Sequence, residues 1–219
     1  MTARPLGGKG LAAAIRAEVT EAAAKLTANG ITPRLAVVGA TADEASAWYA
    51  RSIAAAAGKA GIGCDPVDLG SEADADAIRE TLAGLSADAA VHGIVLQTPL
   101  PGGAMLAELA SAIDPAKDVD GANPQSLGRL ICGLPAFPPA TASAVLAPLD
   151  HHQVELEGRR AVVVGRSIVV GKPVVHLLLG RQATVTVCPL RSAQRSRSCR
   201  RPTGTGNARI RAPSVTSGA

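Results

Sequence analysis

A stretch in the last third of the chain constrains the fold more than any other. Arg160–Val164 is short, β-branched and apolar, as expected of a buried strand. Gly165 interrupts the run, Pro173 stands where the first turn of a helix would begin, and Gly180 is placed to end that helix. A second β-rich run, Ala183–Val187, follows directly. Strand, glycine turn, helix and strand within about thirty residues predict a βαβ unit.

The glycine turn of this unit is a candidate nucleotide site. Backbone N–H groups in such a turn and at the helix N-terminus can hold a phosphate, and Arg166 and Ser167 stand where they could contact phosphate or ribose. The spacing Gly165-x5-Gly171 differs from the usual G-x-G-x-x-G fingerprint. It also fits a tight βα turn that needs glycine only for its backbone freedom. The two polar residues favour the nucleotide interpretation.

The rest of the chain alternates between short apolar runs and amphipathic helical spacing. We expect strands at 33–39, 63–69 and 91–96, helices at 10–29, 44–60, 72–85, 104–112 and 141–150, and mostly loop over 113–139. This order predicts an α/β fold with parallel sheets. Its 219 residues allow one large domain or two small ones, and the 47% of apolar residues are enough for a buried core.

Several classes of protein are disfavoured by composition. No run of about 18 apolar residues is present, so we expect no membrane span. The N-terminus lacks the apolar core of a signal peptide, and the four cysteines are scattered without a C-x-x-C pair. We therefore expect a cytoplasmic protein without a zinc site.

Two loops carry residues suited to chemistry. Tyr49 follows Trp48 on the helix after the first strand, so a flat ligand could stack on it; alternatively Trp48 fills the core and Tyr49 covers its edge. Gln97 follows the strand 91–96, at the strand end where open α/β sheets bind ligands, and prolines 99 and 101 stiffen its loop.

The segment Lys117-Asp-Val-Asp-Gly121 follows the second of these loops in the chain. Asp118 and Asp120 could be calcium ligands, but the further oxygen ligands of a calcium loop are missing. A turn carboxylate or a substrate anchor fits better, and we predict no metal site.

Three motifs in the same order resemble one family. They are His92–Pro101, Lys117–Gly121 with Gly128–Leu130, and Gly165–Pro173. Together they are similar to bifunctional methylenetetrahydrofolate dehydrogenase/methenyltetrahydrofolate cyclohydrolase, the FolD family, from about Gly7 to Cys188.

The resemblance implies a two-domain α/β fold, with a parallel-sheet folate domain and a Rossmann-like NADP domain, and a homodimer in the cytoplasm. It implies NADP-dependent oxidation of 5,10-methylenetetrahydrofolate to 5,10-methenyltetrahydrofolate, and hydrolysis of that product to 10-formyltetrahydrofolate. Carried over by residue, Tyr49 would stack on the folate, Gln97 would orient the catalytic amine or water, and Asp120 would hold the pterin, beside Pro99 and Leu100. Gly165, Arg166, Ser167 and Gly171 would face NADP.

One departure from the family pattern concerns catalysis. The pattern is Tyr-x-x-x-Lys, which places an amine one helical turn from the tyrosine, but here Ile53 stands at the lysine position. Arg51 and Lys59 are the nearest cations, and their helical angles, about 160° and 120° from position 53, do not let either replace it easily. We expect severely impaired hydrolysis and a weakened dehydrogenase step.

A second departure concerns the end of the chain. Residues 189–219 hold seven arginines and no acid, so the formal charge of +4 becomes −3 for residues 1–188. We expect a folate-binding catalytic domain over 1–140, the first part of an NAD(P)-binding domain over 141–188, and a basic, disordered, non-homologous tail over 189–219. A shifted reading frame would explain such a tail. A basic arm for nucleic acid is the alternative, but the tail has no aromatic residue for base stacking.

Two other functions stay open from the sequence. One is a non-catalytic remnant that binds folate without reducing a cofactor, and the other is a different Rossmann dehydrogenase acting on a small acid. The Gln97 and Asp120 loops disfavour the second.

Overall fold

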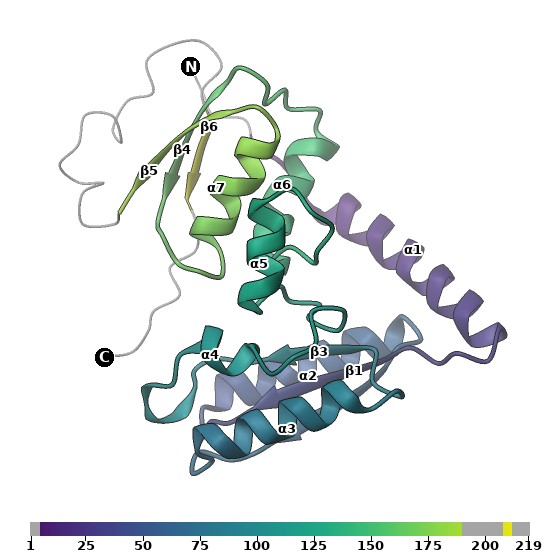
Figure 1. The fold of residues 1–219 in the computed structure, drawn as a ribbon. Coiled ribbons are helices and arrows are strands. Elements are labelled where there is room, and N and C mark those ends of the chain that lie inside the picture. The colour runs from purple at the N-terminus through teal and green to yellow at the C-terminus, as the bar shows by residue number, and fades with distance from the viewer. Residues whose placement is uncertain (1–4, 190–207, 212–219) are drawn as a thin grey trace. The chain divides into compact units, whose positions relative to one another are not determined.

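The structure, a computed structural model, describes residues 5–189 and 208–211, which form two compact units (Figure 1). The first unit is Lys9–Gly128, and the second comprises residues 5–8 and the described residues from Arg129 onward. The boundary at residue 140 between a folate-binding and an NAD(P)-binding domain stays a prediction. The loop after Arg129 closes on itself: Arg129 Nε donates to the Pro135 carbonyl (2.8 Å) and Leu134 N–H donates to the Arg129 carbonyl (2.8 Å).

The first unit contains a three-stranded parallel sheet in the order β2-β1-β3. Three hydrophobic residues of the central strand, Ala36, Val37 and Val38, are at most 1% exposed. In chain order the elements are α1 (Lys9–Ala28), β1 (Arg34–Gly39), α2 (Glu44–Lys59), β2 (Gly63–Asp68), α3 (Ala75–Ala87), β3 (Gly93–Leu96), the 3-10 turn η1 (Pro101–Gly103), α4 (Leu106–Ala110) and α5 (Pro124–Ile131), which crosses the division.

Alternate residues of β1 serve the two faces of this sheet. Ala36 and Val38 join the main core cluster with Ile78 and Leu82 of α3, while α2 packs along β1 and β2. Because all three strands are parallel, their carboxyl ends meet at one edge, and α2 begins shortly after β1 ends there. This edge is where the sequence placed the candidate site.

The start of α2 is fixed by a side-chain cap. The Asp43 carboxylate accepts hydrogen bonds from both the backbone N–H (2.9 Å) and the hydroxyl (2.8 Å) of Ser46. These bonds hold the pKa of Asp43 below its ordinary value. The cap therefore sets the direction in which α2, with Tyr49, leaves β1.

The second unit is built on another parallel sheet, in the order β5-β4-β6 (Figure 1). Its elements are α6 (Ala140–His151), β4 (Arg160–Val164), α7 (Gly171–Gly180), β5 (Thr184–Cys188) and β6 (Ala208–Arg211). The core cluster combines Val163 of β4 with Val174 and Leu178 of α7 and Leu146 of α6. The predicted βαβ unit is present.

The amino-terminal segment of the chain belongs to this second unit. Leu6 packs against the core cluster that contains Leu146 and Val174. His152 Nε2, just beyond α6, donates a hydrogen bond of 3.0 Å to the Gly7 carbonyl. The unit is thus assembled from segments separated by 145 positions in the chain.

Two expectations about loops differ from the structure. The segment 113–139 was expected to be mostly loop, but it contains α5. The missed signals are Asn123, whose side chain accepts from the Gln125 N–H (2.7 Å), and Pro124 at the first helical position. Likewise α7 begins at Gly171, two residues before Pro173, and the Ser167 hydroxyl accepts from the Gly171 N–H (3.2 Å) at its start.

The tail also differs from expectation at one place. Four residues of the segment we expected to be disordered form β6, which pairs with β4 from Ala161↔Ala208 to Val164↔Arg211. The unpaired edge of β4 offers the backbone N–H and C=O groups that such a strand needs. Our expectation for 190–207 and 212–219 lies outside the described residues.

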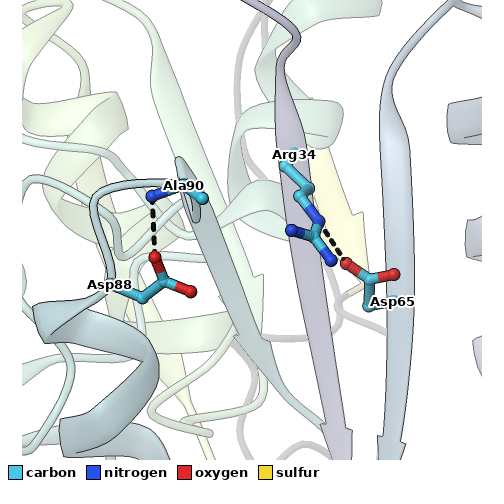
Figure 2. A network of polar contacts seen from close by, with 4 residues as sticks. All are labelled: Arg34, Asp65, Asp88 and Ala90. Carbon is cyan, nitrogen blue, oxygen red and sulfur yellow. Dashed lines mark hydrogen bonds and ion pairs between the residues drawn. The ribbon is translucent and has the colours of Figure 1, made fainter.

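Polar contacts lie at the amino-terminal end of the first sheet, away from the candidate site at its carboxyl end. At the start of β1, Arg34 Nε forms an ion pair of 2.6 Å with Asp65 Oδ2 on β2, and Asp88 accepts from the Ala90 N–H (Figure 2). Both partners of the ion pair are about half exposed, so it contributes little to stability. In the described ranges, no helix is long and apolar enough to cross a bilayer.

Candidate active site

Gln97 is a buried polar side chain at the carboxyl edge of the first sheet. It is 6% exposed, and its backbone N–H donates to the Val38 carbonyl (2.8 Å), which extends the pairing of β3 with β1. Its side-chain Nε2 is buried without a hydrogen-bond partner among the described residues. A buried donor left unpaired typically costs about 1–3 kcal/mol, so this amide is placed for something other than stability.

Gly39, at the end of β1, makes room for that amide. A Cβ at position 39 would lie 3.3 Å from Gln97 Oε1, tighter than an ordinary contact. Next to them is a pocket of about 140 Å³, lined by Val37, Gly39, Thr41, Ser46, Ala47, Ala50, Arg51, Pro66, Val67, Asp68 and Gln97. The pocket therefore lies on the α2 side of the sheet, at the carboxyl ends of β1 and β2.

The α2 residues named from the sequence lie at different depths. Tyr49 and Trp48 are 57% and 64% exposed. The alternative in which Trp48 fills the core is therefore wrong, and the Tyr49 ring is free for a ligand to stack on. Ile53, at the lysine position of the family pattern, is half-buried on the stripe formed by Ser46, Ala50 and Ala57. An aliphatic side chain there adds packing and no proton-transferring group.

Arg51 is closer to the candidate site than helical angles suggested. It lines the same pocket as Gln97, although position 51 is about 160° around the helix from position 53. The helical angle relates Arg51 only to Ile53 and does not locate Gln97, whose side chain lies beside Gly39 at the same pocket. The sequence did not predict that Arg51 and Gln97 line the same pocket, nor that Thr41 and Asp68 also line it.

In the segment Lys117–Gly121, the side chains of Lys117 and Asp118 bond to backbone groups, whereas Asp120 is available to a ligand. Lys117 Nζ donates to the carbonyls of Ser86 and Asp88, 2.7 Å each, and so closes the end of α3. Asp118 is completely buried, and its two oxygens accept from the N–H groups of Ala122 and Asn123, 2.9 Å each. Asp118 is therefore the turn carboxylate that the sequence offered as an alternative to a calcium ligand.

Asp120 remains the available carboxylate of this segment. The segment runs parallel to β3 through a bridge between Ile94 and Asp118, which brings Asp120 toward the end of β3 that leads into Gln97. Burial, and secondarily the charge of Asp118, raise the pKa of Asp120 to about 6. A half-buried carboxylate with a raised pKa gains from a ligand that donates N–H groups to it.

The loop after Gln97 holds Pro99 and Leu100, which the family pattern assigns to substrate. The Thr98–Pro99 bond is cis and Pro99 is exposed. Leu100 is half-buried and packs against the main core cluster. In the described residues, neither Tyr49, Pro99, Leu100 nor Asp120 lines the pocket beside Gln97.

In the second unit, the glycine turn after β4 is held very tightly. Gly165 has φ +123°, and a Cβ on Gly171 would lie 2.8 Å from the carbonyl carbon and oxygen of Gly165. Ser167 Oγ accepts from the N–H groups of Val170 (3.3 Å) and Gly171 (3.2 Å), and its carbonyl accepts from Lys172 (2.9 Å). Since Pro173 has no N–H and the N–H groups of Val170, Gly171 and Lys172 all donate to Ser167, the backbone at the start of α7 has few donors left for a ligand.

The groups left for a ligand at this turn suit a phosphate ester. Arg166 is exposed at the end of β4, and Lys172 is exposed on the first turn of α7. The Ser167 hydroxyl accepts within the turn but keeps its own proton to donate. The donor set is cationic and hydroxylic, so the residues present fit the phosphates of a dinucleotide, through side chains more than through the helix terminus.

Comparison with known proteins agrees with both halves of this description. Residues 6–120 match the tetrahydrofolate dehydrogenase/cyclohydrolase catalytic domain, and residues 139–203 match the NAD(P)-binding domain of the same family. The second match continues beyond Cys188, where we expected the resemblance to stop. Bifunctional protein FolD 1 of Saccharopolyspora erythraea is 68% identical over 185 residues, which cover 84% of this chain and 63% of that protein. The FolD 1 protein of Rhodococcus jostii is 61% identical over 185 residues, covering 84% and 62%.

Solved structures give the same result. The bifunctional FolD enzyme of Campylobacter jejuni is 35% identical with a TM-score of 0.82, over 85% of this chain and 66% of that one. The Trypanosoma brucei FolD structure, complexed with NADP cofactor and an inhibitor, is 34% identical with a TM-score of 0.80, over 86% and 65%. The chain thus spans slightly less than two thirds of the length of these relatives. Within that span the fold is the same, and the chain belongs to the tetrahydrofolate dehydrogenase/cyclohydrolase family.

Proposed function

We propose that this chain binds 5,10-methylenetetrahydrofolate and oxidises it to 5,10-methenyltetrahydrofolate with NADP. The observation that carries the proposal is the buried amide of Gln97, whose Nε2 has no partner among the described residues and which lies at the carboxyl edge of a family-matched sheet. A ligand with an acceptor atom would satisfy that donor. Family membership supplies the class of ligand.

Three residues of the first unit are given roles toward the folate. The exposed ring of Tyr49 stacks on a planar part of the substrate. Gln97 donates from Nε2 and orients the reacting group. Asp120 accepts N–H groups of the pterin in its ionised form, which dominates above its pKa of about 6. Pro99 and Leu100 shape the loop beside them.

The second unit is proposed to hold NADP. Arg166 and Ser167 bind its phosphates and ribose, and the close approach of Gly171 to Gly165 keeps the turn narrow. The nicotinamide supplies the hydride acceptor for the folate methylene when the cofactor is bound. The protein's part is to orient the two ligands.

The hydrolytic step is proposed to be severely impaired in this chain. Water that attacks the methenyl carbon must lose a proton, and a positioned acid or base for such a transfer is typically worth roughly 10²–10⁴-fold. Ile53 cannot accept that proton. Arg51 lines the Gln97 pocket, but a guanidinium carries only donors and offers no acceptor for a water proton. In this proposal the proton leaves mainly to solvent.

A second candidate is a folate-binding remnant without turnover, and the aliphatic Ile53 is the observation that favours it. One experiment separates the two. The purified chain is mixed with NADP and 5,10-methylenetetrahydrofolate, and NADPH is followed by absorbance. Folate binding is followed separately by the fluorescence of Trp48, the one tryptophan, which adjoins Tyr49.

NADPH formation together with quenching supports the dehydrogenase proposal. Quenching without NADPH overturns it in favour of the remnant, and the absence of both signals overturns both functions. A Tyr49→Ala variant is the control, because it should lose the quenching while Trp48 stays in place.

A further inference from the structure

The pocket beside Gln97 has features that the proposed folate site does not use. It is lined by one cation, Arg51 on α2, and one anion, Asp68 at the end of β2. Neither residue forms an ion pair with any residue in the described ranges, and Asp68 spends one oxygen on the Gly70 N–H (2.9 Å). Two opposite charges, both on exposed side chains, thus line one pocket from two different elements without an ion pair between them.

The pocket exists because small residues meet there. Gly39 of β1 and Ala47 and Ala50 of α2 are among its lining residues. Its volume of about 140 Å³ is close to that of an engineered cavity of about 150 Å³ that holds benzene. The pocket therefore suits a ligand of roughly half a dozen heavy atoms and cannot hold a whole folate.

The buried amide indicates that the pocket receives a polar ligand. Gln97 is more than nine-tenths buried, lines the pocket and has an unpartnered Nε2. An acceptor oxygen in the ligand would satisfy this donor, whereas an apolar occupant would leave it unpaired. A carboxylate placed there could also accept from Arg51 in a charge-assisted bond.

The charge balance then selects the rest of the ligand. A simple anion would gain from Arg51 but would be repelled by Asp68, and a simple cation would meet the reverse. A ligand that carries both charges matches both walls. We propose that this pocket binds a small zwitterion, with its carboxylate toward Arg51 and Gln97 and its ammonium toward Asp68, as in an α-amino acid of the size of glycine.

This site does not depend on the proposed dehydrogenase activity, and only Gln97 is shared with the folate site. The test therefore changes Arg51 and Asp68. The full chain, labelled with ¹⁵N, is titrated with glycine, acetate and methylammonium, and shifts of the backbone amides of Gly39, Thr41 and Ala50 are followed by NMR. Affinity is expected in the millimolar range, because so small a ligand makes few contacts.

Glycine should bind the native chain at least about tenfold more tightly than acetate or methylammonium, which each have one of its charges. Arg51→Gln should weaken glycine by about tenfold or more. Asp68→Asn should weaken glycine likewise but strengthen acetate, since it removes a repulsive charge. Arg16→Gln, an exposed arginine on α1, is the matched control and should change nothing.

Three results would overturn the proposal: no glycine-dependent shift at these amides, acetate binding the native chain as tightly as glycine, or glycine affinity unchanged in Arg51→Gln. Folate binding is measured on the same samples. If the native chain binds folate but not glycine, only the zwitterion site is refuted. If it binds glycine but not folate, only the proposed function is refuted.

Discussion

Gly171 approaches Gly165 so closely that no side chain fits between them: a Cβ on Gly171 would lie 2.8 Å from the carbonyl carbon and oxygen of Gly165. The contact joins the end of β4 to the start of α7. It therefore fixes the width of the turn that presents Arg166 and Ser167.

Replacing Gly171 by alanine should destabilise the second unit. The backbone of Gly165 cannot yield as a flexible side chain would, so we expect a loss of about 1–3 kcal/mol in the free energy of unfolding and weaker NADP binding. Urea unfolding followed by circular dichroism measures the first, and calorimetric titration the second. Gly180→Ala is the matched control, because a Cβ there meets nothing within 4 Å. A Gly171→Ala protein as stable as the native chain would contradict the close contact.

Gln97→Met should separate stability from function. The substitution removes a buried donor that has no partner and keeps a similar volume, so unfolding should cost about 1 kcal/mol more than in the native chain. Folate quenching of Trp48 should be lost. Gln125→Met, at an exposed position of α5, should change neither quantity beyond about 0.5 kcal/mol. Destabilisation by Gln97→Met would mean that its amide has a structural partner.

Ile53→Lys should restore proton transfer for the hydrolytic step. The new amine stands one helical turn after Tyr49, and we expect hydrolysis of 5,10-methenyltetrahydrofolate to rise by roughly 10²–10⁴-fold. Loss of the methenyl chromophore measures the rate. Ser52→Lys adds the same charge at the neighbouring exposed position and should give no gain. Strong hydrolysis by the native chain, with no increase in Ile53→Lys, would refute the assignment.

Asp120 should leave a pH signature in stability. Its folded pKa of about 6 lies above the ordinary 3.8, so its stabilising contribution is complete below about pH 4 and is lost as the pH rises through 6. The difference in unfolding free energy between the native chain and Asp120→Asn should therefore change by about 2–3 kcal/mol over this window, in favour of the variant at neutral pH. Urea unfolding at a series of pH values gives this difference. A difference that stays constant with pH would place the pKa of Asp120 near its ordinary value.

The sequence predicted the elements well where local pattern and tertiary packing agree. β1, α2, β4 and β5 have the expected positions, because β-branched runs and glycine or aspartate boundaries are local signals that the core reinforces. α5 was missed because its signals are a cap and a proline instead of an apolar period. β6 was missed because its partner, β4, lies more than forty residues away in the chain.

The candidate site shows the same limit. Gln97 was predicted from the end of a strand, which the parallel order fixes, and Asp120 from the family resemblance. The relation between Arg51 and Gln97 was not found, because it depends on three small residues, Gly39, Ala47 and Ala50, that leave a space between α2 and the sheet. In the same way the sequence did not predict that the side chains of Lys117 and Asp118 hydrogen-bond to backbone groups, because those partners come together only in the folded chain.

The place of Leu6 and Gly7 in the second unit sets an order of events during synthesis. Leu6 and Gly7 are synthesised well before their partners, because the core that receives Leu6 and the His152 ring that bonds to Gly7 come far later in the chain. Over 145 positions, at about 5–20 residues per second, they wait roughly 7–29 s, while the unit Lys9–Gly128 can already fold. Leu6 and Gly7 therefore find their native partners only after the whole of the first unit has been synthesised.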